Sequence, residues 1–410
     1  MKKSNFNDKY SILLGVFWLI CVGIGHGQDF RQSSLDSLYA HYERSISNKT
    51  LAGVEALLIL NDRVVWHQAQ GVADVAAKTP LQPNSIYYIQ SMTKPIISVA
   101  IMQLVERGLL ALDDPIEMYI PEAKDLGVAL NVDLGVDSPM QKVNRSLTIL
   151  DLLTHTSGLS HGLGDSKLDQ QLFKALYDET LNYRSHESLE DRVFKLLSFP
   201  LVAQPGTLWY YSAGADVLAL ILQRVSKQSI PSYLKTNIFD PLDMHDTGYN
   251  LDELQSRRVM KLHSRNENDP VKRHEQQVPT SGNTIYGGTH GLFSTASDYA
   301  QFCLMILHNG AWNGAQILKA DTVKNIRTNH TADLYNEEGA GFGLGFSVIL
   351  IPEKMNRPGG IGQIQWGGYF STHFFIDPEI KAIGIILTQQ MPDGEDINTP
   401  FQNNVYRALN

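Results

Sequence analysis

The sequence predicts an α/β fold of the α+β sandwich type, in which one antiparallel sheet is built from both ends of the chain and flanked by helices. Strand patterns occur at 54–69 near the N-terminus and again between 343 and 388 near the C-terminus. From about 116 to 285 the apolar spacing is mainly helical, with long polar loops. Neither end can bury a sheet face alone, so we expect one shared sheet and a separate, all-helical lobe.

The composition is that of an ordinary globular protein. The 410 residues are 43% apolar and 19% charged, enough for one large domain or two closely packed domains with a real core. The net charge of −9 is dispersed along the chain, which argues against a nucleic-acid partner. Composition leaves the oligomeric state open.

The first residues have the pattern of a secretory signal peptide. Basic residues precede an apolar run at 12–24, and small residues then occupy the two positions that define a cut before Gln28. We therefore expect a signal peptide at 1–27 and export to the periplasm or the exterior. The apolar run is short for a membrane span, so no stable membrane insertion is expected once it is removed. An uncleaved N-terminal membrane anchor is the alternative.

The cysteines and histidines of the sequence predict neither a disulfide nor a metal site. Once residues 1–27 are removed, Cys303 is the only cysteine, so the mature chain has no internal disulfide. Cys303 lies in an apolar helical stretch and is expected in the core. No Cys/His cluster has the spacing of a zinc site, and we expect neither a metal nor a cofactor.

The first part of the chain combines strands with an apolar helix. Its expected elements are a polar amphipathic helix at 28–50, a hairpin at 54–60 and 63–69, an extended segment at 85–89 and an apolar helix from about Ser91 to a stop near Pro115.

The later elements follow from the same patterns. Between 116 and 285 we expect a short helix before Gly158, a turn at 205–207, a long apolar helix at 216–225 and a polar, irregular, exposed insertion at 251–283. After it we expect a helix at 297–309, strands within 343–350, 363–377 and 381–388, and a closing helix at 401–409. No internal repeat is visible.

Two side chains at the start of the apolar helix form a candidate nucleophile and base. Ser91 and Lys94 are three positions apart and share one helix face. A hydroxyl nucleophile needs an adjacent base, and a helix N-terminus favours developing negative charge. Ser-x-x-Lys is the nucleophile motif of β-lactamases and penicillin-binding proteins. A second match to the motif, at 232–235, is not followed by an apolar helix. The motif therefore indicates a nucleophile only where the surrounding sequence supports it.

Five stretches in order resemble the serine β-lactamase and penicillin-binding-protein superfamily, with class C β-lactamases included. They are Ser91-Met-Thr-Lys94, Gly108-Leu-Leu-Ala-Leu-Asp-Asp-Pro115, Asp151-Leu-Leu-Thr-His-Thr-Ser-Gly-Leu159, Pro205-Gly-Thr-Leu-Trp-Tyr-Tyr-Ser212 and Gly291-Leu-Phe-Ser-Thr-Ala-Ser-Asp-Tyr299. The resemblance implies a β-lactamase/transpeptidase-like domain at 28–405. Its α/β part would be 28–115 and 286–405, and its mainly helical lobe 116–285.

The resemblance implies roles for three side chains. Ser91 would be the nucleophile and Lys94, with a lowered pKa, the base. Tyr211 would match the family's shared acid/base, with the Lys94 ammonium favouring its phenolate form. Tyr210 is the competing tyrosine, but the tyrosine directly before Ser212 fits the motif. Asn, which the family carries two positions after this tyrosine, is replaced by Ala213.

The third family element also departs from the common pattern. Lys-Thr-Gly or His-x-Gly is usual, whereas this chain has Trp366, Gly367 and Gly368, which resembles family VIII carboxylesterases. The resemblance makes these three residues substrate-binding. It also places an oxyanion hole at the backbone N–H groups of Ser91 and Tyr369.

Three histidines and one acid near these motifs are expected to be structural or to line the cleft. His155 belongs to a structural turn in the family, His161 could line the substrate cleft, and His290 lies beside it in a supporting place. Asp216 opens a helix and is expected to act as an N-terminal cap.

The sequence therefore indicates a serine hydrolase that forms an acyl-enzyme on Ser91, as a carboxylesterase acting on small acyl esters. Trp366 cannot supply the charge with which the usual Lys binds a β-lactam carboxylate. A class C-like β-lactamase or a D-amino-acid peptidase is the alternative, because either would use the same Ser91, Lys94 and Tyr211. A non-catalytic binding protein on this fold is a third alternative.

Overall fold

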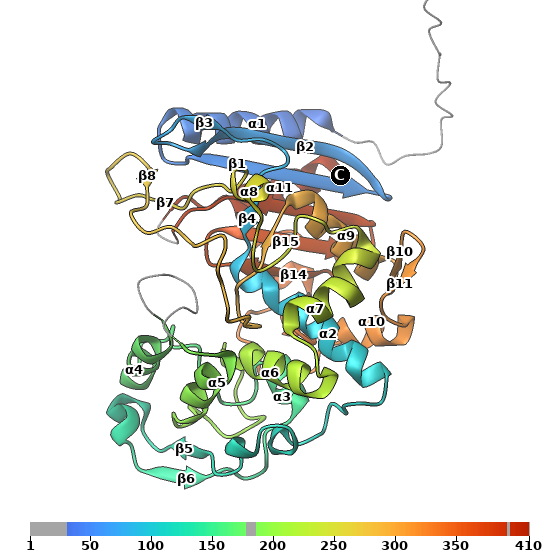
Figure 1. Ribbon diagram of the computed structural model, residues 1–410. Coiled ribbons are helices and arrows are strands. Elements are labelled where there is room, and N and C mark those ends of the chain that lie inside the picture. The colour runs from blue at the N-terminus through green and yellow to red at the C-terminus, as the bar shows by residue number, and fades with distance from the viewer. Residues whose placement is uncertain (1–30, 178–185, 392–393, 410) are drawn as a thin grey trace, which may run out of the picture.

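The computed structural model describes residues 31–177, 186–391 and 394–409 (Figure 1). Its centre is an eight-stranded sheet made of β1 (Gly53–Leu60), β2 (Arg63–Asp74), β3 (Thr79–Pro80), β12 (Ala340–Phe342), β13 (Ser347–Ile349), β14 (Ile364–Gly368), β15 (Thr372–Asp377) and β16 (Ala382–Leu387). The strand order is β12-β13-β14-β15-β16-β1-β2-β3, and every neighbouring pair is antiparallel.

The two ends of the chain meet in this sheet, which confirms the predicted fold class. β1 pairs with β16, and Glu55 lies opposite Leu387. Both strands are buried almost throughout, because helices cover the two faces of the sheet. Strands covered on both faces need apolar side chains in both directions, which explains their continuous apolar sequence.

Eleven α-helices occur among the described residues. They are α1 (Gln32–Ser47), α2 (Thr93–Glu106), α3 (Ile149–Leu153), α4 (Lys167–Leu176), α5 (Leu189–Leu197), α6 (Gly214–Ser226), α7 (Ile230–Leu234), α8 (Glu253–Ser256), α9 (Ala296–Leu307), α10 (Ala320–Ile326) and α11 (Asn398–Leu409). None of these helices combines the length and the apolar character that crossing a membrane requires. The predicted signal peptide at 1–27 lies outside the described residues.

Short strand pairs stand apart from the main sheet. They are β4 (Tyr87–Tyr88) with β9 (Phe293–Ser294), β5 (Gly127–Ala129) with β6 (Met140–Lys142), β7 (His263–Ser264) with β8 (Lys272–Arg273), and β10 (Ala311–Trp312) with β11 (Ala315–Gln316).

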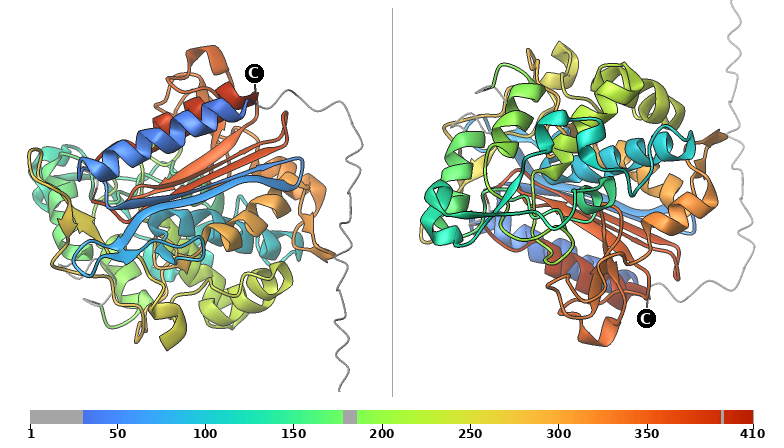
Figure 2. Two further views of the ribbon diagram at one scale, coloured as in Figure 1. Left: turned by 90° about the horizontal axis from the view of Figure 1, so that it is seen from above. Right: turned by 90° about the horizontal axis from the view of Figure 1, so that it is seen from below.

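The helices α1 and α11 cover one face of the sheet and lie side by side (Figure 2). Leu35, Leu38 and Tyr42 of α1 share a hydrophobic cluster with Phe401 and Val405 of α11. The backbone N–H of Arg31 donates to the Ala408 carbonyl at 2.8 Å. The first and last described segments are therefore neighbours.

The other face of the sheet is covered by α9 and by α2, which also packs against α6 of the helical lobe (Figure 1). Every residue of α2 from Thr93 to Leu104 is buried. A helix that is apolar all round needs covering on every side, and its place between the sheet and the lobe supplies this. The start of α2, with Ser91 just before it, thus lies at the junction of the two layers. Cys303, on α9, is fully buried as predicted.

Three parts of the chain differ from the sequence prediction. The lobe at 116–285, expected to be all-helical, also contains the short strand pairs β5–β6 and β7–β8. The apolar run at 363–377 forms two strands, β14 and β15, joined by a turn at 369–371 in which Ser371 has a left-handed φ of 61°. The segment at 251–283 is irregular, but it is not exposed throughout. Val259 and Met260 are buried because the chain there pairs with the backbone of Ile86.

Candidate active site

Ser91 lies in a 3₁₀ turn, Gln90–Met92, that leads directly into α2. Gln90 has a left-handed φ of 49°, a conformation that costs free energy for a residue with a side chain. The predicted geometry is confirmed, because the Nζ atom of Lys94 lies 3.2 Å from the Oγ atom of Ser91.

Lys94 is buried in spite of its charge, with 2% of its surface exposed. Its Nζ donates a hydrogen bond to the Thr289 carbonyl at 2.9 Å. Burial lowers the pKa of Lys94 to about 7, the nearby Asp216 carboxylate raises this pKa, and the Arg192 guanidinium lowers it. Near neutral pH a large fraction of Lys94 is therefore an uncharged amine able to accept a proton.

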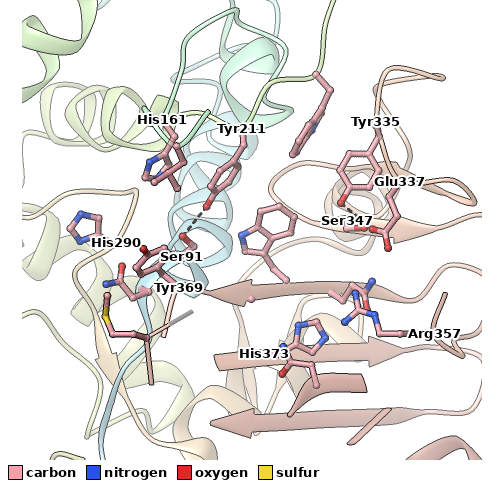
Figure 3. A pocket seen from close by; sticks show the side chains of 18 of the residues that line it. Ser91, His161, Tyr211, His290, Tyr335, Glu337, Ser347, Arg357, Tyr369 and His373 are labelled. Atoms are coloured by element: carbon pink, nitrogen blue, oxygen red, sulfur yellow. Dashed lines mark hydrogen bonds between the residues drawn. The ribbon is translucent and has the colours of Figure 1, made fainter. Parts of the chain in front are cut away.

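Tyr211 joins Lys94 beside the serine hydroxyl, and Figure 3 shows its side chain directed at Ser91. Its phenol donates to Ser91 Oγ at 2.8 Å, and Lys94 Nζ lies 4.7 Å from the centre of its ring. The His161 ring stacks on the other side at 5.0 Å. The competing Tyr210 instead donates to Asp169 at 2.8 Å.

The protonation expected for Tyr211 needs correction. The sequence suggested a phenolate-like side chain beside the Lys94 ammonium. Burial dominates in the structure and raises the pKa of Tyr211 above its ordinary value, while the hydrogen bond with Ser91 lowers it by less. Because the pKa of Lys94 is low, there is also little ammonium charge to stabilise a phenolate. Tyr211 is thus a phenol near neutral pH, and Lys94 is the better proton acceptor.

The third predicted family element, Trp366 to Gly368, lies on β14 close to the segment that carries Ser91. The Trp366 ring is 5.7 Å from the Tyr211 ring, and Gly367 and Tyr369 line the same cavity as Ser91. A Cβ atom on Gly368 would lie 2.4 Å from the Ile89 carbonyl oxygen, so only glycine lets β14 approach the segment before Ser91 this closely.

The three histidines have separate surroundings. The Nδ1 atom of His155 lies 3.0 Å from the Ser212 hydroxyl. His161 and His290 line the cavity, where their rings contact the hydroxyls of Tyr177 and Tyr88 at 2.8 and 2.9 Å. Burial lowers the pKa of all three histidines, followed by the charge of Lys94 or Arg192. They are neutral near pH 7 and have partners other than Ser91.

A buried ion pair behind Lys94 is the functional feature that sequence reasoning missed. Arg192 Nε donates to Asp216 at 2.7 Å, and both side chains are about 1% exposed. The other Asp216 oxygen accepts the backbone N–H groups of Gly288 and Thr289 at 2.9 and 2.8 Å. Asp216 is therefore not the N-terminal cap of α6, where Ala213 stands. It instead fixes the loop whose Thr289 carbonyl binds Lys94.

These residues open onto a cavity of about 700 Å³. On the side of the helical lobe its lining is mainly apolar and aromatic: Leu163, Phe173, Tyr177 and Trp209. On the side of the sheet it is more polar: Tyr335, Glu337, Ser347, Arg357, Gln365, His373 and Asn398 (Figure 3). Within the described parts of the chain, no group of three or more His, Cys, Asp or Glu side chains could hold a metal ion.

The second Ser-x-x-Lys match has no such surroundings. Ser232 lies on α7, and the Lys235 side chain is exposed and paired with Asp240. The Lys235 side chain is 68% exposed, and its partner is Asp240 and not Ser232. Context thus separates the two matches, as expected.

Comparison with known proteins gives concordant results. Residues 38–405 match the family model described as Beta-lactamase. An uncharacterized protein of Mycobacterium tuberculosis is 30% identical over 374 residues, which cover 88% of this chain and 91% of that protein. The esterase EstB of Burkholderia gladioli is 26% identical over 381 residues, which cover 87% of this chain and 91% of EstB. The solved structure of EstCE1, a hydrolase with promiscuous acyltransferase activity, has a TM-score of 0.76 at 21% identity and covers 92% of this chain and 98% of that one.

Proposed function

The chain belongs to the Beta-lactamase family, and we propose that it is a carboxylesterase that hydrolyses small acyl esters through an acyl-enzyme on Ser91. The observation that carries the proposal is a buried lysine of lowered pKa, 3.2 Å from a serine hydroxyl that also contacts a buried phenol. Such a base can remove a hydroxyl proton near neutral pH. The esterase-like relatives support an ester as the substrate.

Acylation follows from these contacts. The Ser91 oxygen attacks the ester carbonyl while its proton passes to the neutral amine of Lys94. Negative charge develops on the former carbonyl oxygen, where we place the backbone N–H groups of Ser91 and Tyr369 as the oxyanion hole. The tetrahedral intermediate then expels the alkoxide.

The leaving group takes its proton from Tyr211, which bridges Ser91 and the cavity. The proton that Lys94 accepted then passes to the Tyr211 oxygen, since Lys94 Nζ and the Tyr211 phenol both lie beside the Ser91 oxygen, at 3.2 and 2.8 Å. In deacylation the same two groups act in reverse: water attacks the acyl-enzyme, its proton passes to Lys94, and Ser91 recovers a proton as the acid leaves. Each cycle consumes one ester and one water.

The third element favours esters over anionic β-lactams. Trp366 occupies the strand position at which the family's lysine helps to hold the β-lactam carboxylate, and an indole carries no charge. We therefore assign Trp366, Gly367 and Gly368 to substrate positioning: the indole forms a wall beside Tyr211, and the glycines allow the close approach of β14.

The test is hydrolysis of a short-chain p-nitrophenyl ester by the purified protein and by Ser91→Ala. Turnover by the wild type and its loss in the variant are expected, since no other group would take the acyl. A protein that leaves such esters intact and hydrolyses cephalosporins would contradict the esterase proposal. A fluorescent penicillin that labels Ser91 and stays bound would instead favour a penicillin-binding protein or D-amino-acid peptidase.

Acyl transfer to an alcohol is a second candidate, favoured by the cavity volume of about 700 Å³ and by the acyltransferase activity named for EstCE1. The acyl-enzyme would be the same, with an alcohol in place of water. Adding a primary alcohol during ester turnover measures how the acyl group is divided between water and the alcohol. Formation of the new ester at concentrations of alcohol far below that of water would support transfer.

We further propose that the chain is exported, on the strength of the signal pattern at 1–27. Expression of the full-length gene followed by fractionation and N-terminal sequencing tests this. A mature N-terminus at Gln28 is expected, whereas an intact N-terminus in the membrane fraction would indicate the anchored alternative.

A further inference from the structure

The polar wall of the cavity, which includes Tyr335, Ser347 and Arg357, lies apart from Ser91 (Figure 3). It contains Arg357, which stands between β13 and β14 and is half-buried. Arg357 forms no ion pair and no hydrogen bond with any described residue. A partly desolvated guanidinium that is not directly paired is costly, and the Asp396 carboxylate acts on Arg357 only through space, without an ion pair.

Neighbouring groups on the same wall also lack hydrogen-bond partners among the described residues. His373, 5% exposed, has an unpaired Nε2 atom, and Ser347, 2% exposed, has an unpaired hydroxyl. The Trp366 indole N–H is unpaired as well. Ser347 and Trp366 lie close enough to the phenols of Tyr335 and Tyr211 to lower the pKa values of those phenols, but neither contact has full hydrogen-bond geometry, so both donors can turn to a ligand.

These groups are suited to donate hydrogen bonds. The guanidinium and the indole have donors only, and the hydroxyl can rotate to donate. Burial, and then the charge of Arg357, lower the pKa of His373 to about 3, so the imidazole is neutral and carries one N–H. A wall of unpaired donors around one cation requires a ligand rich in acceptors.

The two nearest acids do not serve as that ligand. The Asp396 carboxylate accepts the backbone N–H groups of Asn398 and Thr399 at 2.9 and 3.1 Å, ahead of α11. The Glu337 carboxylate accepts the Tyr335 phenol at 3.3 Å and forms no ion pair with Arg357. Glu337 does line the cavity, so its negative charge would oppose a bound anion. Its replacement by glutamine therefore provides a second variant for the test.

We propose that Arg357, with His373 and Ser347, forms a subsite for a carboxylate on the ester substrate, remote from the bond that is cleaved. The planar guanidinium can accept a carboxylate through two parallel hydrogen bonds. This inference rests on the proposed esterase function and narrows its substrates to esters that carry a free acid. It differs from the lysine that the family carries at the position of Trp366, because Arg357 stands in the chain before β14, on the polar wall that it shares with His373 and Ser347.

Matched pairs of esters test the subsite. The charged set comprises p-nitrophenyl monoesters of glutaric, adipic, pimelic and suberic acid, and the neutral set comprises the p-nitrophenyl alkanoates of equal chain length. Butanoyloxybenzoate against phenyl butanoate tests a carboxylate on the alcohol side. For each pair the ratio of kcat/KM, charged over neutral, is measured in the wild type, Arg357→Gln, Glu337→Gln and Lys354→Gln.

We expect one chain length, or the alcohol-side acid, to give the highest ratio. Arg357→Gln should lower that ratio about tenfold or more, mainly through KM, because a charge-assisted bidentate contact is lost. Glu337→Gln should raise it. Lys354→Gln removes the same charge from the same loop, but Lys354 is exposed and paired with Glu338, so the ratio should stay within about twofold.

A ratio that Arg357→Gln leaves unchanged, or lowers no more than Lys354→Gln does, would overturn the subsite. Failure of the esterase proposal is recognised separately, because no ester of either set would then show turnover that depends on Ser91. In that case, calorimetric measurement of suberate binding to Ser91→Ala tests the subsite independently of turnover. Binding that Arg357→Gln abolishes supports the subsite, and absence of binding refutes it.

Discussion

Replacing the buried Lys94 with methionine should make the fold more stable near neutral pH while removing the proposed catalytic base. The lysine is fully enclosed, and its pKa falls from the ordinary 10.5 to about 7 in the folded protein. Between these two pH values the unfolded chain binds more protons than the folded chain. The free energy of unfolding of the wild type therefore rises with pH across this window and is lowest below it.

The size of the effect follows from the shift. One pKa unit corresponds to about 1.4 kcal/mol, so enclosing Lys94 lowers the free energy of unfolding by about 4 kcal/mol at pH 7 and by about 2 kcal/mol at pH 9. Methionine has a similar length and no charge. It leaves the Thr289 carbonyl without its donor, which costs about 1–2 kcal/mol. The net gain for Lys94→Met is about 2–3 kcal/mol at pH 7 and close to zero at pH 9.

Urea unfolding of the wild type and the variant at both pH values measures this difference. Lys354→Met provides the control, because its exposed lysine should change stability by no more than about 0.5 kcal/mol at either pH. The reasoning would be refuted by a Lys94→Met variant that is less stable than the wild type at pH 7, or by a gain that does not shrink as pH rises.

Three further outcomes are expected from the same site. The kcat/KM for a neutral ester should rise with pH through about 7 as Lys94 loses its proton, which a pH–rate profile checks; a flat profile would exclude this base. Tyr211→Phe should lower kcat by about a hundredfold or more with little change in unfolding free energy, measured by steady-state kinetics and denaturation; near-normal kcat would remove Tyr211 from proton transfer. Asp216→Asn should destabilise the fold by about 3 kcal/mol or more, since the buried Arg192 guanidinium loses the carboxylate that it binds; denaturation of this variant beside Asp240→Asn, at an exposed ion pair, tests it, and equal losses would contradict it.

The parts of the site that lie close together in sequence were predictable. Ser91 and Lys94 share one turn, so helix periodicity alone brings the amine to the hydroxyl. Tyr211 is 120 positions from Ser91, and no periodicity relates them. Its placement needed the resemblance to a known family, and its protonation needed the burial that only the structure supplies.

Pairings between polar residues far apart in the sequence could not be predicted either, because no periodicity relates such residues. Arg192 lies in a charged stretch that resembles a solvated helix surface, yet it is enclosed and bound to Asp216. Arg357 is one arginine among many in the sequence, and only the arrangement of β13, β14 and β15 shows that it lines the cavity without an ion pair to any described residue. The turn at 369–371 was missed because Gly367 and Gly368, which lead into it, were assigned to the substrate-binding strand, although the Gly368 carbonyl closes the turn by accepting the Ser371 N–H.

The pairing of β1 with β16 also governs the order in which the protein can be made. About 330 positions separate Glu55 from its partner Leu387, so a ribosome releases the β1–β2 hairpin long before the strand that completes it. Throughout that interval the nascent chain exposes an unpaired, strongly apolar strand edge, the kind of surface that recruits chaperones or seeds aggregation. Chains that terminate before β16 should consequently accumulate as insoluble material, although the whole Ser91–Lys94–Tyr211 cluster has already been synthesised.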